Sequence, residues 1–126
     1  MIVNAAAIIF SILTGIVIIF HACLAAGLPW GAASMGGKFQ GKYPPKMRVV
    51  AVINILILLF IAIIGLSRAN LLFTPMMSFS KPAMWVVVAF FVIATVMNTI
   101  TPSKIERIWA PVAGMQLITS IIIALS

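Results

Sequence analysis

Apolar runs of helix length, separated by short polar breaks, dominate this sequence. They cover about residues 2–28, 45–67, 83–100 and 104–125. A helix needs about 20 apolar residues to cross the hydrocarbon core of a bilayer. Only 7% of the residues are charged, against about 25% in a soluble domain, so a water-soluble fold would expose large apolar patches. The sequence therefore predicts an all-α, four-transmembrane-helix bundle that forms a single membrane domain over residues 1–126.

The first apolar run, from Ile2 to Leu28, is predicted to be a retained helix and not a cleaved signal peptide. It is longer than the apolar core of a signal peptide, which has about 7–15 residues, and it has no basic start. Gly27 suits a helix C-cap, and Pro29 cannot continue a helix. Small residues spaced by four positions let helices approach closely in lipid. One face, which we expect to point into the bundle, carries Ala7, Ser11, Gly15, Ala22 and Ala26.

Basic residues concentrate in the first break, Leu28–Arg48, which holds four of the eight Lys and Arg residues. The first and third breaks together hold six: Lys38, Lys42, Lys46, Arg48, Lys104 and Arg107. Because loops rich in Lys and Arg stay in the cytoplasm, loops 1 and 3 are predicted to be cytoplasmic. Both termini then lie outside the cell (inner) membrane of a bacterium. The net charge of +7 is attributed to topology and to anionic lipid headgroups, and no nucleic-acid partner is predicted.

The two later breaks carry proline and capping signals. The second break, Arg68–Pro82, is moderately apolar and is predicted to be a loop in the membrane interface. Ser103 and Glu106 match a capping box, in which the serine accepts from the Glu106 amide and the Glu106 carboxylate reaches back. Pro111 lies inside the predicted fourth span and should kink it, which frees the carbonyl oxygen of Arg107.

Each predicted helix carries a polar side chain at a similar depth, on the same face as its small residues. At a rise of 1.5 Å per residue, these side chains lie about 7–10 Å from the predicted cytoplasmic end. The candidate polar layer consists of His21, Asn54, Thr95, Asn98 and Gln116. Two interpretations stay open. The layer either fixes the packing through hydrogen bonds between helices or forms a small polar site, open to the cytoplasm, with His21 as a titratable group.

A candidate cytoplasmic cap is predicted over this layer, because the first and third breaks should meet on one side of the membrane. Its residues are Trp30, Arg48, Ser103, Glu106 and Arg107. Trp30 suits the headgroup level. Arg48 and Arg107 either pair with Glu106 or contact lipid phosphate, and the capping role accounts for Glu106 without catalysis.

The sequence offers no constellation for catalysis or cofactor binding. It contains one Cys, one His and one acid, so an intrachain disulfide and a cysteine-based metal site are excluded. The phosphate-binding patterns GxGxxG and GxxxxGK[ST] are absent from it. We therefore predict no catalytic residue, no metal ligand and no cofactor.

Two motifs give the chain a resemblance. One is Pro29-Trp30-Gly31 followed by Gly36-Gly37, Gly41, Pro44 or Pro45, and Arg48. The other is Met97-Asn98 followed by Ser103, Glu106-Arg107 and Pro111. Together they resemble a group of small, functionally uncharacterised four-helix bacterial integral membrane proteins. The residue at Pro102 is more often basic in that group, so the turn before the fourth helix is expected to differ here. The resemblance implies the topology and assigns no activity.

The function predicted from these features is that of a non-enzymatic, multi-pass membrane protein with a cytoplasmic cap over a shallow polar layer. It would act by binding a partner, or as a small transport or channel subunit, which in a bundle of this size requires a homo-oligomer. The alternative is an immunity or stress-protection protein of the membrane. A lipid-modifying enzyme that uses His21 or Glu106 as a base is the least favoured class.

Overall fold

The computed structural model describes residues 2–33, 37, 41–69 and 77–126. Four long α-helices are present in this part of the chain: α1 (Ile2–Ala25), α2 (Pro45–Arg68), α3 (Met77–Ile100) and α4 (Trp109–Ala124). Two 3-10 turns, η1 (Gly31–Ala33) and η4 (Glu106–Ile108), stand before α2 and α4. Each of the four helices is long and apolar enough to cross a membrane, counting η4 with α4.

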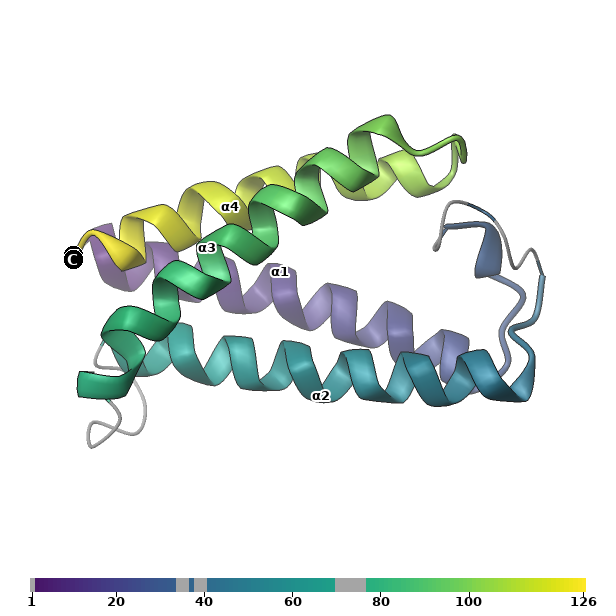
Figure 1. The fold of residues 1–126 in the computed structure, drawn as a ribbon, viewed down its shortest axis with the longest axis horizontal. Coiled ribbons are helices and arrows are strands. Elements are labelled where there is room, and N and C mark those ends of the chain that lie inside the picture. The colour runs from purple at the N-terminus through teal and green to yellow at the C-terminus, as the bar shows by residue number, and fades with distance from the viewer. Residues whose placement is uncertain (1, 34–36, 38–40, 70–76) are drawn as a thin grey trace.

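The helices form an up-and-down bundle (Figure 1). Helix α1 packs on α2 and on α4, and α3 packs on α4. Helix α3 crosses α2 close to its own start, and the two helices then diverge (Figure 1). They diverge toward the end of the bundle that carries the α1–α2 and α3–α4 connections, which we call the loop end. The start of α1 and the end of α4 lie at the opposite end, called the terminal end.

The predicted C-cap of the first helix is confirmed at Gly27. Its φ of 95° lies in the left-handed region that glycine adopts without a steric cost. The Leu28 N–H donates to the Cys23 carbonyl oxygen at 3.0 Å, and the Gly27 N–H donates to that of Leu24 at 3.1 Å. These two bonds form a Schellman motif, which satisfies carbonyl groups at the end of a helix.

Replacing Gly27 with alanine is expected to lower the free energy of unfolding by about 1–2 kcal/mol, the cost of a left-handed conformation for an L-residue. The new Cβ would also lie 2.9 Å from Nη2 of Arg48. The measurement is denaturant unfolding in mixed micelles, with Gly114→Ala as the control, since a Cβ there meets nothing within 4 Å. Equal stability of the two variants would contradict this account of Gly27.

The predicted second loop is wrong at its C-terminal side, where α3 already begins at Met77. Residues 70–76 of that predicted loop lie outside the described residues. Pro82 lies within α3. A proline in a helix cannot donate to the carbonyl four residues earlier, here that of Ser78, and its ring crowds that carbonyl. Pro82 lies in the second turn of α3, so the disturbance falls near the N-terminus of the helix.

The predicted kink at Pro111 is also wrong. The chain makes the η4 turn at Glu106–Ile108, and α4 begins only at Trp109. Pro111 therefore lies in the first turn of α4, where an N–H would have no acceptor within the helix. The serine half of the predicted capping box is present, because the Glu106 N–H donates to Oγ of Ser103 at 3.3 Å. The Ser103 N–H donates to Oγ1 of Thr101, also at 3.3 Å.

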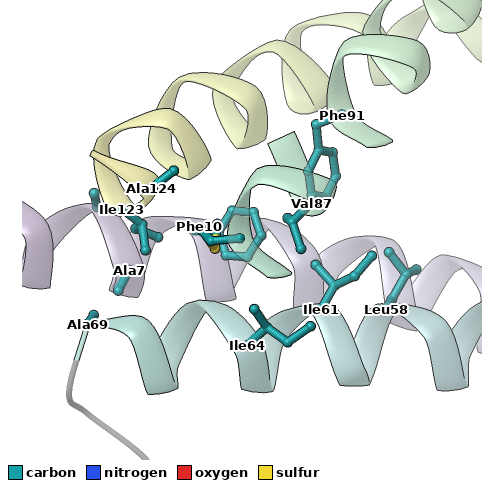
Figure 2. Packing of buried hydrophobic residues seen from close by; sticks show 12 residues of the cluster. Ala7, Phe10, Leu58, Ile61, Ile64, Ala69, Val87, Phe91, Ile123 and Ala124 are labelled. Atoms are coloured by element: carbon teal, nitrogen blue, oxygen red, sulfur yellow. The ribbon is translucent and has the colours of Figure 1, made fainter. Parts of the chain in front are cut away.

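A tightly packed apolar core fills the terminal end of the bundle (Figure 2). At its centre is Phe10, which is fully buried and meets Phe91 edge-on, with ring centroids 5.5 Å apart. A Cβ on Gly65 of α2 would lie 3.1 Å from Cε2 of Phe10, so the ring rests directly on this glycine. Around the two rings pack Leu58, Ile61, Ile64, Met84, Val87 and Ile123.

The small-residue face predicted to point inward on the first helix is only partly right. Ala7 is buried, whereas Ala22 and Ala26 are exposed. The buried set is Ala6, Ala7, Phe10, Thr14, Phe20 and Leu24. Small and large side chains therefore alternate on the buried face, with Phe10, Phe20 and Leu24 filling the wider spaces between the helices, and an outward alanine costs little in lipid.

Candidate functional site

A cleft of about 810 Å³ occupies the loop end of the bundle. All four helices contribute to it, together with η1, η4 and the turn that follows α3. Most of its lining is apolar, and its walls on α2 and α3 are formed by Leu58, Phe90 and Met97.

Four of the five residues of the candidate polar layer line this cleft: His21, Asn54, Asn98 and Gln116. Thr95, the fifth, is not among the described lining residues, and its Oγ1 donates to the Phe91 carbonyl oxygen at 2.7 Å. One predicted polar side chain from each helix therefore lines the cleft. Their shared location in one cleft, and not only in one layer, is a finding of the structure.

Hydrogen bonds between helices account for only part of the layer. Nε2 of Gln116 donates to Oγ1 of Thr14 at 3.0 Å, which joins α4 to α1 through two buried side chains. His21 and Asn98 instead bond within their own helices. Nδ1 of His21 is paired with the Val17 carbonyl oxygen at 2.9 Å, and Nδ2 of Asn98 donates to that of Ala94 at 2.7 Å. A hydrogen bond between helices thus accounts for the position of Gln116, whereas these hydrogen bonds of His21 and Asn98 do not join helices.

The five residues of the candidate cytoplasmic cap lie at the loop end, in or beside the two connections. Glu106 alone among them lines the cleft. Arg48 lies against Gly27, and its Nε donates to the Tyr43 carbonyl oxygen at 3.0 Å. Arg107 is exposed, and its Nε donates to the Thr101 carbonyl oxygen at 3.1 Å. Trp30 is 47% exposed, and Ser103 is half-buried in the α3–α4 turn.

Trp109 joins the two connections across the mouth of the cleft. Its indole Nε1–H donates to the Ala33 carbonyl oxygen at 3.0 Å, and its ring lies 4.7 Å from that of Phe20. Trp109, Ala33 and Phe20 all line the cleft. The prediction that the first and third breaks meet is confirmed by the contacts between η1 and η4. Nothing in the sequence indicated the bond between Trp109 and Ala33.

Glu106 and His21 are the only acid and the only histidine of the chain, and both line the same cleft. Among the described residues, no group of three or more His, Cys, Asp or Glu side chains could hold a metal ion. The polar side chains that line the cleft are those of His21, Asn54, Asn98, Thr101, Glu106 and Gln116.

Comparison with protein-family models, curated proteins and solved structures finds no match to this chain. The function is argued below from the geometry of the cleft.

Proposed function

We propose that this chain is a multi-pass protein of the cell (inner) membrane that binds an amphiphilic molecule in the cleft and acts through that binding, without chemistry. The observation that carries the proposal is the cleft itself. Its volume, about 810 Å³, falls in the range of about 300–1,000 Å³ typical of small-molecule sites. Such sites are also lined mainly by apolar side chains with a few polar groups that fix orientation, as this one is.

The arrangement of the lining suits a molecule with one apolar and one polar end. Leu58 and Phe90 lie deeper in the bundle, near the packed core, while Glu106 and Thr101 lie at the loop end. An alkyl chain placed between α2 and α3 would contact the apolar walls, and its polar end would reach the side chains near the turn. The change from an apolar lining inside the bundle to a polar lining at the loop end therefore suits a lipid-soluble molecule whose polar end lies at headgroup level.

We propose further that the loop end faces the cytoplasm. Support comes from the excess of Lys and Arg in the first and third connections. Four of these side chains are exposed at this end, where they would contact anionic headgroups: Lys42, Lys46, Lys104 and Arg107.

Cysteine labelling in intact cells tests this orientation, with Cys23 replaced by alanine to give a background without thiols. A thiol at Lys42→Cys is expected to react only with reagents that enter the cell, and one at Ser126→Cys with reagents that do not. Labelling of both positions from the same side would overturn the proposed topology.

Binding is tested with the full chain in phosphatidylcholine nanodiscs, in a variant whose only tryptophan is Trp109 (Trp30→Phe, Trp85→Phe). Three probes are used, each an octadecyl chain with a nitroxide near its polar end. The polar group is a methyl ester in the first probe, a carboxylate in the second and an ammonium in the third. Because Trp109 lines the cleft, at least one probe should quench its fluorescence saturably.

The control uses two matched substitutions on α3. Ala94 lines the cleft, so Ala94→Phe should narrow it and weaken the saturable quenching. Ala89 is exposed and is not among the described lining residues, so Ala89→Phe should bind as the parent does. Quenching that stays linear with every probe, or that is the same in both variants, would overturn the proposed function.

A further inference from the structure

The cleft is about as deep as one leaflet of a bilayer. On α3 its lining extends from Phe90 to Ile100, which at 1.5 Å per residue is about 15 Å along the helix. The hydrocarbon core of a bilayer is about 30 Å thick, and one leaflet makes up half of it. The lining continues at the loop end to Thr101 and Pro102. In the membrane proposed above, the cleft therefore extends from the headgroup level to the middle of the bilayer.

The back and the deep end of the cleft are closed by packing. On the side of α1 and α4, which pack on each other, the lining includes Phe20, Ala113 and Gln116, and all three are buried. At the deep end, Phe91 lines the cleft and packs edge-on against Phe10 of the core. A ligand that entered through these close-packed contacts would have to unpack the bundle.

The two connections bridge the loop end of the cleft. The turns η1 and η4 contact each other, and the bond from Nε1 of Trp109 to the Ala33 carbonyl oxygen joins them at 3.0 Å. Ala33 and Thr101 line the cleft from this end, and both are buried. A molecule that entered from the aqueous side, past these residues, would have to part this bridge.

The cleft is open along α3. Three of its lining residues on this helix are strongly exposed: Phe90 (41%), Met97 (59%) and Ile100 (69%). Because α3 packs on α4, the open side of α3 is the side toward α2, which contributes Asn54 and Leu58 to the lining. The surroundings of a membrane-spanning helix are lipid. An acyl chain of a neighbouring lipid can therefore enter the cleft sideways, between α2 and α3.

A guanidinium group lies beside the cleft at headgroup level. Nε of Arg107 donates to the Thr101 carbonyl oxygen at 3.1 Å, and Thr101 is a buried residue of the lining. Arg107 is exposed, and this bond uses only one of the N–H groups of the guanidinium. The remaining N–H groups can bind a phosphate, which arginine holds through two parallel hydrogen bonds. The α3–α4 connection also carries Lys104, so its two cations outnumber its one acid, Glu106.

We propose that the ligand of the cleft is a glycerophospholipid of the bilayer, one acyl chain of which enters sideways between α2 and α3 while Arg107 binds its phosphate. This inference rests on the proposed function and names the ligand class of that same site. The second acyl chain stays in the surrounding leaflet, which only a cleft open toward lipid permits. A chain in the cleft supplies the dispersion contacts that an empty space would forfeit.

The test uses the full chain with Trp109 as its only tryptophan, in maltoside micelles, which contain no phosphate. Two lipids with two acyl chains, a phosphatidylglycerol and a diacylglycerol, carry a nitroxide on the same carbon of one chain. Both should quench Trp109 saturably. The phosphatidylglycerol should bind at least about tenfold more tightly, because charge-assisted hydrogen bonds to its phosphate are added.

Matched variants assign the two parts of the ligand. Arg107→Gln should weaken the phosphatidylglycerol about tenfold and change the diacylglycerol less than about twofold. Lys81→Gln removes the same charge from an exposed position near the start of α3 and should change neither affinity. Ala94→Phe should weaken both lipids, since both place a chain in the cleft, whereas Ala89→Phe should weaken neither.

The outcomes separate this inference from the proposed function. Equal affinities for the two lipids, or equal weakening of both by Arg107→Gln, would overturn the assignment of the phosphate to Arg107. Saturable quenching by the single-chain methyl ester probe, but by neither two-chain lipid, would overturn sideways entry, while binding to the cleft would stand. Saturable quenching by none of these probes would overturn binding itself.

Discussion

Phe10→Ala is expected to destabilise the bundle by about 3 kcal/mol, the low end of the range for removing a buried phenylalanine ring. Phe10 is fully buried, rests on Gly65 and meets Phe91 edge-on, so its loss opens a cavity among several helices (Figure 2). The low end applies because in lipid the unfolded helices stay in an apolar solvent, so the cost comes mainly from lost packing. The measurement is the free energy of unfolding in mixed micelles.

The control for this prediction is a phenylalanine that faces outward. Phe60 is 49% exposed, and in lipid its replacement by alanine removes contacts that lipid tails can supply. Phe60→Ala should therefore cost less than about 1 kcal/mol. If Phe10→Ala proved no more destabilising than Phe60→Ala, the packed core at the terminal end would not be the main source of stability.

Gly65→Val should destabilise the bundle by about 1–3 kcal/mol, the cost typical of an overpacked core. Even the Cβ of alanine would lie 3.1 Å and 3.2 Å from two carbons of the Phe10 ring, and valine adds two methyl groups beyond it. The ring cannot move away freely, since Phe91 packs against it with centroids 5.5 Å apart. Unfolding in mixed micelles measures the loss.

Two further variants show whether the loss comes from this contact. A Cβ at Gly15 would meet nothing within 4 Å, so Gly15→Val should stay within about 0.5 kcal/mol of the parent. Adding Phe10→Leu to Gly65→Val should give a double variant that is more stable than the sum of the two losses predicts, by about 0.5–3 kcal/mol. Strict additivity, or equal losses at Gly15 and Gly65, would show that the ring does not rest on this glycine.

Periodicity predicts the inward faces of the helices only in part. In the predicted polar layer, Gln116 on α4 is buried, whereas Asn54 on α2 and Thr95 and Asn98 on α3 are half-buried. The same argument misleads on α1, where Ala22 and Ala26 are exposed. A stripe of alanine favours close approach only where a neighbouring helix lies near, and at the loop end the helices are spread around the cleft.

The ends of the helices are harder to predict because proline gives an ambiguous signal. Pro111 lies in the first turn of α4, where a missing N–H disturbs little, whereas Pro82 lies inside α3 and costs the hydrogen bond to the Ser78 carbonyl. Read without the structure, Pro82 suggested a longer loop and Pro111 a kink. By contrast, Gly27 followed by Pro29 marks the end of α1 unambiguously, because the left-handed C-cap and the break coincide.

The cleft could be predicted only in part. Depth along each helix placed His21, Asn54, Asn98 and Gln116 at one level, but depth says nothing about the distance between helices. The divergence of α2 and α3 (Figure 1) depends on how the helices pack on one another, which the depth of single residues does not describe. The bond from Trp109 to Ala33 joins a side chain to a main-chain oxygen, and such pairs leave no pattern in a sequence.

Photo-crosslinking tests the central claim, that the cleft holds an amphiphile, most directly. An octadecylamine with a diazirine in its chain would be irradiated with the protein in nanodiscs, and the labelled residues would be identified by mass spectrometry. Labels are expected on residues that line the cleft, such as Leu58 and Met97, and Ala94→Phe should reduce them. Labels confined to outward residues such as Ile19 and Val86, equal in both proteins, would contradict the claim.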